Sequence, residues 1–215
     1  MPDLTPARRT LLKGAAWTLP TVAVASAAPA LAASPCAART CPVDISFGAP
    51  TGGDPSATTT ASWSSSTSGT LAATASPNGR SKGPGFRTRD PLENPAAGTW
   101  FGVGWEARSG TVTVTATRTV PVTLTAGCPY RFTTLASYYR GQSALTMRVN
   151  VGSNPVLTWS VPAGALVTGS ETVSADFMVP TTGRYTVTIS MTLANSGTNG
   201  NNNDLYINNP EILCV

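Results

Sequence analysis

The chain has 215 residues, a formal net charge of +4 and only 11 % charged residues. So small a net charge argues against a nucleic-acid-binding protein, because such proteins carry a clustered excess of Lys and Arg. Histidine is absent, which excludes Ser-His-Asp and Cys-His catalytic sets and disfavours a zinc site.

Residues 1–32 are predicted to be an export signal. Arg8 and Arg9 precede a long uncharged run that ends at residues 30–32, Ala-Leu-Ala, which is the small-x-small pattern of a cleavage site. Cleavage there leaves residues 33–215, about the size of one β-sandwich domain. The sequence therefore predicts one domain that works outside the cytoplasm.

The heptapeptide at residues 7–13, Ala-Arg-Arg-Thr-Leu-Leu-Lys, resembles the twin-arginine export consensus, in which Ser or Thr precedes Arg-Arg-x-Phe-Leu-Lys. The resemblance implies export by the twin-arginine route and is typical of secreted actinobacterial proteins. A membrane anchor is the alternative. It is disfavoured because Pro20 and Pro29 interrupt an apolar run that is already short of the roughly 20 residues of a bilayer span.

Four cysteines lie in the predicted mature part: Cys36, Cys41, Cys128 and Cys214. An even number of cysteines in an oxidising compartment predicts two disulfides. Four cysteines permit three connectivities, and the placement of the predicted strands favours two of them about equally. One joins Cys36 to Cys41 and Cys128 to Cys214, and the other joins Cys36 to Cys128 and Cys41 to Cys214.

From residue 43 onward apolar residues recur at every second position, which is typical of strands with one face in water. The alternation is clearest in 111–117, 120–125 and 185–193. The other predicted strands span 43–47, 58–63, 99–106, 130–140, 144–151, 156–161, 171–179 and 203–212. About ten strands without helices predict an all-β fold, a two-sheet β-sandwich of the jelly-roll type.

The stretch 76–97 is rich in Gly and Pro and is predicted to be irregular. It carries the basic residues Arg80, Lys82, Arg87 and Arg89. The simpler interpretation is a solvated connection between strands. The alternative is a loop that binds an anionic wall polymer.

The residues 204–212, Asp-Leu-Tyr-Ile-Asn-Asn-Pro-Glu-Ile, resemble the closing strand of galactose-binding-like jelly rolls, where Asp-x-x-Ile-Asp-Asn-Val-x-Leu recurs. This superfamily includes many carbohydrate-binding modules. Residues 124–132 resemble its Leu-x-x-Gly-x-x-Tyr-x-Phe entry to a central strand, and 183–187 its penultimate strand. The chain departs from the pattern at Asn208, which replaces an aspartate, and at Pro210, which predicts a bulge or an edge.

The same closing strand contains the candidate metal ligands. Asp204 and Asn208 are candidate calcium ligands, because calcium prefers carboxylate and amide oxygens. Asn208 weakens such a site, since it carries no charge. No other cofactor is predicted.

Sugar binding requires aromatic rings that stack on pyranose faces. The candidate rings are those of Trp63, Trp100, Trp105, Trp159, Tyr138, Tyr139 and Tyr206. Trp100 is preferred to Trp105, because it shares its strand face with Gly102 and Gly104 and is therefore expected to be exposed. Tyr139 is the second candidate, with Arg140 beside it at a strand end.

The sequence predicts a secreted, non-catalytic binding domain whose partner is a glycan of the cell envelope or of the environment. The scattered carboxylates do not mark the acid and nucleophile of a glycosidase. The alternative function is a structural or adhesive surface protein that recognises another protein. Neither a nucleic acid nor a stable membrane anchor is expected for the mature form.

Overall fold

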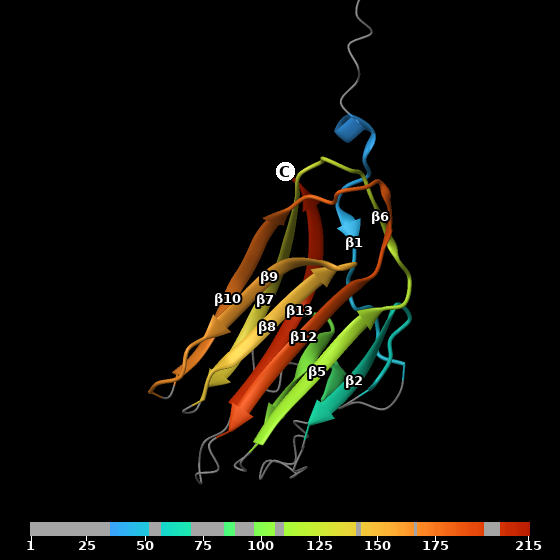
Figure 1. Ribbon diagram of the computed structural model, residues 1–215. Helices are drawn as coiled ribbons and strands as arrows, with labels where there is room; N and C mark the ends of the chain where they lie inside the picture. The colour runs from blue at the N-terminus through green and yellow to red at the C-terminus, as the bar shows by residue number, and fades with distance from the viewer. Residues whose placement is uncertain are drawn as a thin grey trace, which may run out of the picture.

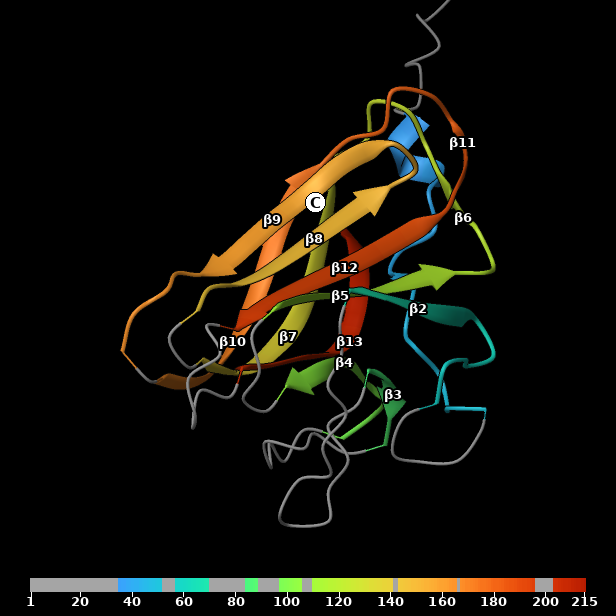
Figure 2. The ribbon, with the colours of Figure 1, turned by 60° about the horizontal axis from the view of Figure 1, so that its bottom comes forward.

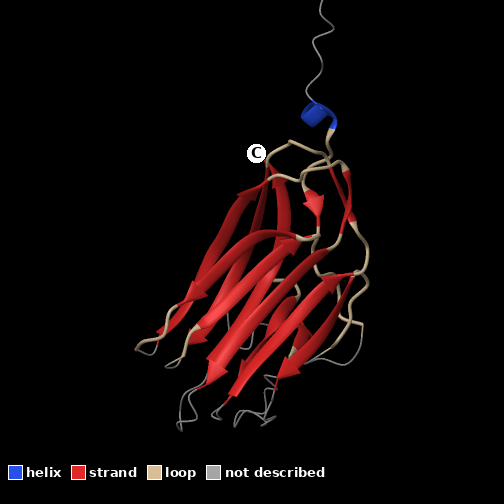
Figure 3. Cartoon of the chain, in the orientation of Figure 1, coloured by secondary structure: helices blue, strands red, loops and turns tan. Residues whose placement is uncertain are grey.

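The computed structural model describes residues 35–51, 57–69, 84–88, 97–105, 110–140, 143–165, 167–195 and 203–215. The predicted signal, 1–32, lies outside these ranges, and its role stays a prediction. Apart from the short 3-10 helix η1 (Pro35–Ala38), the regular elements of the described chain are strands (Figure 3). Within the described ranges, no helix has the length and apolar character of a membrane span.

The strands form two antiparallel sheets that pack face to face (Figure 1). The first sheet has the order β10 (Val167–Phe177), β7 (Tyr130–Arg140), β13 (Asn203–Cys214), β4 (Trp100–Trp105) and β3 (Gly85–Arg87), and β1 (Val43–Asp44) also pairs with β13. The second sheet has the order β2 (Trp63–Gly69), β5 (Gly110–Arg118), β12 (Val187–Asn195), β8 (Leu145–Val151) and β9 (Asn154–Val161). A small ribbon joins β11 (Gly183–Tyr185) to β6 (Val122–Leu124).

The chain passes repeatedly from one sheet to the other, and Figure 2 allows these crossings to be followed. Strand β4 of the first sheet leads to β5 of the second, β7 leads to β8, β9 leads back to β10, and β12 leads back to β13. This alternation, with β13 between β4 and β7 and β12 between β5 and β8, is the arrangement of a jelly roll. The predicted fold class is confirmed.

Most predicted strands overlap the observed ones. The strand predicted at 43–47 is shorter, since β1 spans Val43–Asp44, and the one predicted at 185–193 is divided between β11 and β12. Two further differences lie in the region before β4. The strand predicted at 58–63 begins instead at Trp63 and runs through the hydroxyl residues to Gly69. This strand lies at the edge of its sheet, where a largely exposed Ser-rich sequence gives no apolar period. Strand β3 lies inside the stretch predicted to be irregular, because the single inward residue Phe86 is too little to produce a period.

Aromatic side chains fill one part of the space between the sheets. Phe47 lies 5.2 Å from Trp63, 5.4 Å from Phe86 and 5.9 Å from Phe101 between ring centroids. The indole nitrogen of Trp63 donates a hydrogen bond to the backbone oxygen of Ser46 at 3.1 Å. Full burial of each ring contributes roughly 1.5–3 kcal/mol, so this cluster holds the segment after β1 between the two sheets.

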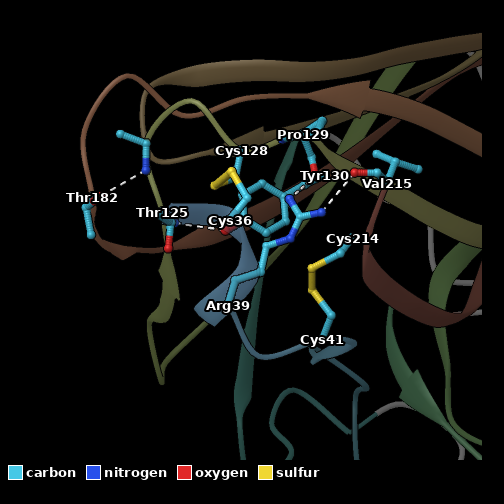
Figure 4. The surroundings of a disulfide bond; sticks show 11 residues. Cys36, Arg39, Cys41, Thr125, Cys128, Pro129, Tyr130, Thr182, Cys214 and Val215 are labelled. Atoms are coloured by element: carbon cyan, nitrogen blue, oxygen red, sulfur yellow. Dashed lines mark hydrogen bonds between the residues drawn. A yellow bond between two sulfur atoms is a disulfide. The ribbon is translucent and has the colours of Figure 1, made fainter. Parts of the chain in front are cut away.

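Both disulfides lie at one end of the sandwich (Figure 4). Cys36 is bonded to Cys128 with a Cα–Cα distance of 5.4 Å, and Cys41 is bonded to Cys214 with a distance of 5.8 Å. The two predicted disulfides are confirmed, and the structure selects the second of the two open connectivities. Cys36–Cys128 ties the start of the described chain to the turn before β7, and Cys41–Cys214 ties it to the end of β13.

Arg39 adds a polar clamp between the two disulfides. Its guanidinium donates hydrogen bonds to the backbone oxygens of Pro129, at 2.6 Å, and of Val215, at 2.8 Å. It also lies 5.2 Å from the centroid of the Tyr130 ring. Figure 4 shows this side chain between the two cystines, where it fixes η1 against the end of the first sheet.

The predicted irregularity at Pro210 is present. The pairing of β13 with β7 shifts its register between Asn208 and Glu211, and Asn209 has a positive φ of 49°. The hydroxyl of Thr134 donates to the backbone oxygen of Asn208 at 2.9 Å, which satisfies a carbonyl where the ladder is interrupted. The bulge alternative is confirmed, while the edge alternative is wrong because β13 lies inside the sheet.

Candidate functional site

Strand register brings four of the predicted site residues onto one face of the first sheet. Asp204 lies opposite Tyr139, and Asn208 lies opposite Trp100. Leu205 and Ile207, which alternate with these residues on β13, belong to the core. The four side chains therefore belong to the face that points away from the core, which we call the outer face.

Trp100 has no solvent-exposed surface, so the expectation that it presents an exposed ring is wrong. The glycines that suggested open space beside it are in fact covered. A Cβ at Gly102 would lie 2.7 Å from Cδ1 of Tyr206, which shows that the Tyr206 ring rests on this position. The absence of a side chain at Gly102 therefore allows close contact with a ring of the same chain, and it does not open the position to solvent.

Arg87 and Tyr206 extend this outer face and were not predicted as a pair. The guanidinium carbon of Arg87 lies 4.7 Å from the centroid of the Tyr206 ring, in a cation–π contact. Arg87 is 2 % exposed and Asp204 is 1 % exposed. Burial of charged side chains is costly, so their presence on an outward sheet face marks it as a candidate site.

The sequence contained only part of the information needed to predict the contact of Arg87 with Tyr206. The alternating glycines of β4 indicate that a large side chain of a neighbouring strand lies over them. The position of Arg87 had no such signal, because β3 has three residues.

Among the described aromatic side chains of the outer face, Tyr139 is the one that reaches solvent, since Trp100 and Tyr206 are buried. It lies between Asp204 of β13 and Thr168 of β10 in the register of the sheet. The side chain of Arg140 and that of Trp105 lie outside the described part. The predicted pairing of Tyr139 with Arg140 stays a prediction.

A second pair of rings lies between the sheets near the same end of β7. Tyr138 and Trp159 are partly buried, and their ring centroids are 5.6 Å apart. Gly169 lies opposite Tyr138, and a Cβ there would collide with the Tyr138 hydroxyl group. This glycine lets the Tyr138 ring lie over β10. The partly exposed rings of β7 thus gather away from its first residue, Tyr130, which lies at the disulfide end.

The predicted calcium ligands do not fit one ion. Asp204 and Asn208 are four residues apart on one strand, so their side chains lie roughly 13 Å apart, whereas calcium ligands lie about 2.4 Å from the ion. The described residues contain no group of three or more His, Cys, Asp or Glu side chains that could hold a metal ion. A calcium ion shared by Asp204 and Asn208 is therefore wrong on geometric grounds.

Asn208 has a structural partner instead. Its side-chain nitrogen donates to the backbone oxygen of Ala97 at 2.9 Å, and the side-chain nitrogen of Asn209 reaches the same oxygen at 3.5 Å. These amides tie the irregular part of β13 to the segment before β4. The Ala97 oxygen accepts N–H donors here, which leaves it unsuited to a cation.

An ion pair lies on the outer face toward the disulfide end. Arg131 donates to Asp176 through Nε at 2.6 Å and through Nη2 at 3.0 Å. The hydrogen bond lowers the pKa of the Asp176 carboxyl, and the same contact raises the pKa of Arg131. Both groups are charged at neutral pH, and the exposed pair joins β7 to β10 with little net charge.

No protein-family model matches the chain, and no curated protein matches it. Solved structures do match. One is a tailspike protein 4 domain of bacteriophage CBA120, with 15 % identity, a TM-score of 0.45, and coverage of 72 % of this chain but 20 % of the tailspike chain.

Two further matches cover most of the matched chain. A carbohydrate-binding module of the Cellvibrio mixtus lichenase 5A, solved with cellotriose, has 16 % identity and a TM-score of 0.36, covering 62 % of this chain and 88 % of its own. A Stig cyclase of Fischerella has 13 % identity and a TM-score of 0.46, covering 81 % and 97 %. Each of these identities is below 25 % and each TM-score is below 0.5, so the matches assign no function to this chain.

Proposed function

We propose that residues 33–215 form a secreted, non-catalytic domain that binds a glycan of the cell envelope or of the environment through the outer face of the first sheet. The observation that carries this proposal is the position of Tyr139. Its partly exposed ring lies in one row between Asp204 and Thr168. The neighbouring Arg87 and Tyr206 are buried and stacked.

This row has the chemistry that a sugar requires. An aromatic ring can stack on the apolar face of a pyranose, and the exposed Thr168 beside Tyr139 offers a hydroxyl group to the sugar. Asp204 is 1 % exposed, so it belongs to the packed cluster beside the ring and not to the contact surface. The packed cluster around Tyr206 fixes the sheet beneath the ring, so little conformational entropy is lost on binding.

Two features of the chain support a binding role over a catalytic one. The sequence has no histidine, and all four cysteines are in disulfides. The usual base-activated Ser or Cys nucleophiles therefore have no partner in this chain.

Replacing Tyr139 by alanine is expected to weaken binding to a soluble polysaccharide by about 1–3 kcal/mol, which is the scale of a lost interface anchor. The Y139F variant keeps the ring and should retain most of the affinity. Affinity electrophoresis through gels that contain single polysaccharides measures the effect, and isothermal titration calorimetry quantifies it.

The matched control is Y185A, which removes a partly exposed tyrosine from β11, outside the outer face. Y185A should keep polysaccharide binding as long as its melting temperature shows a folded protein. If the parent retains no polysaccharide and instead captures a surface protein, the adhesive alternative replaces the glycan proposal.

Secretion is part of the same proposal. The two disulfides support folding in an oxidising compartment. Replacing Arg8 and Arg9 together by lysine is expected to trap the precursor inside the cell, because the twin-arginine route reads the arginine pair. Immunoblots of cell and medium fractions measure this, with K13R as the control. Normal secretion of the double variant would assign the chain to the general secretory route.

A further inference from the structure

In the described part of the chain the two large sheets have four end strands, and three of them are protected against pairing with another chain. Strand β3 has only three residues. The first half of β2 is covered, because the backbone nitrogen of Ser65 donates to the oxygen of Thr58 at 2.7 Å. Strand β9 contains Pro155 and an irregular register with β8. Short length, coverage, proline and bulges are among the devices that prevent edge pairing, and charged side chains are another.

Among the described residues, strand β10 has neither the short length, the proline, the bulge nor the covering segment that protect the other three. Its eleven residues pair with β7 in unbroken register, and they include no proline, lysine or arginine. It ends its sheet, and no strand of the described residues pairs along its other edge. A long, regular end strand of this kind offers a template for another strand.

The sequence of β10 is nearly symmetric in residue type about its central residue, Thr172. If a second β10 lies antiparallel with Thr172 opposite Thr172, residues of like character face one another across the pair. The facing residues are Val167 and Phe177, Thr168 and Asp176, Gly169 and Ala175, Ser170 and Ser174, and Glu171 and Val173. Apolar residues meet apolar residues at both ends, small residues meet small residues, and no two charges lie directly opposite.

The charges of the strand fit this pairing. Arg131 of β7 holds Asp176 in a two-pronged ion pair, so Asp176 brings little net charge to the edge. Glu171 is exposed and is the other acidic residue of the strand. In the pair the two Glu171 side chains are diagonal neighbours, roughly 7–8 Å apart, where solvent and salt screen them.

We propose that the partner of the β10 edge is a second copy of this chain. The two β10 strands pair antiparallel about a two-fold axis at Thr172, which joins the two first sheets into one continuous sheet. Because the axis is perpendicular to that sheet, the outer faces of both copies point to the same side.

This arrangement has a consequence that rests on the proposed function. It places two Tyr139 rows on one surface, so a repeating glycan could engage both. Binding of a polymer would then exceed the affinity of either site through effective concentration. The dimer itself requires no glycan, so it can be tested separately.

The test uses the exported protein without ligand and measures its mass by sedimentation equilibrium from low to high micromolar concentration. Thr172 is exposed, so T172K and T172E should fold normally. Each variant alone places two like charges face to face, and the dimer dissociation constant should rise about tenfold or more. An equimolar mixture of T172K and T172E places opposite charges at the axis, and the dimer should return.

Thr158 provides the matched control, because it is an exposed threonine on β9, the end strand of the second sheet. T158K and T158E should leave the mass distribution unchanged, and E171Q should tighten the dimer by removing the diagonal repulsion. A monomer at every concentration would overturn the proposal. A dimer that T172K leaves intact, or one that T158K dissociates, would overturn it equally. Polysaccharide retention by monomeric T172K would show that the glycan site stands independently.

Discussion

Loss of either disulfide is expected to lower the free energy of unfolding by about 2–5 kcal/mol. The variants are C36A/C128A and C41A/C214A, and guanidinium unfolding followed by tryptophan fluorescence measures the change. The bonded cysteines are 92 residues apart in sequence in Cys36–Cys128 and 173 residues apart in Cys41–Cys214. In the chain-entropy model each bond stabilises by restricting the unfolded chain, more so for a longer loop.

The two bonds should nevertheless contribute about equally. Once Cys36–Cys128 is formed, the shortest covalent path between Cys41 and Cys214 runs through that bond, and the loop that Cys41–Cys214 closes is about half as long. The loss in either double variant is therefore of similar size.

An R39A variant serves as the comparison, because it removes the clamp at the same end of the sandwich and leaves both bonds intact. Its loss of stability should be smaller, since Arg39 is partly exposed. Stability that does not change in either double-cysteine variant would contradict the prediction.

Replacing Trp100 by alanine is expected to lower the free energy of unfolding by about 3–5 kcal/mol, because the ring is fully buried and its removal leaves a cavity. The same denaturant experiment measures the loss. Y139A is the comparison on the same face, since its ring is partly exposed and should cost far less stability.

The two variants separate scaffold from site. W100A should change stability strongly, and any loss of polysaccharide binding should follow the loss of folded protein. Y139A should change binding and leave the unfolding midpoint nearly in place. A stable W100A that fails to bind polysaccharide would return Trp100 to the role of an exposed platform.

Composition and apolar alternation were sufficient to predict an all-β fold and the course of its main strands. Strand β7 spans the predicted residues 130–140, because the apolar period of two is a direct product of one buried and one wet face. The number of strands and the lack of helical period were enough for a jelly roll. Pro210 marked its bulge, since proline cannot donate to a ladder.

Other features depend on contacts between residues that are far apart in the sequence. Cysteine spacing is compatible with several pairings, and the pairing was fixed when the sheet brought the end of β13 beside the start of the described chain. Strand β3 gave no period because it contributes one core residue, Phe86, whose position depends on packing against Phe101 at 4.9 Å.

The candidate site shows the same division. Alternation placed Trp100 on the face opposite Phe101, and the register confirms that face. Alternation says which side of a sheet a residue occupies. Whether that side is open depends on neighbouring strands, and here the ring of Tyr206 lies over Gly102 while Arg87 stacks on it. Burial on a sheet face is a property of strand order, and strand order is set by contacts between residues far apart in the sequence.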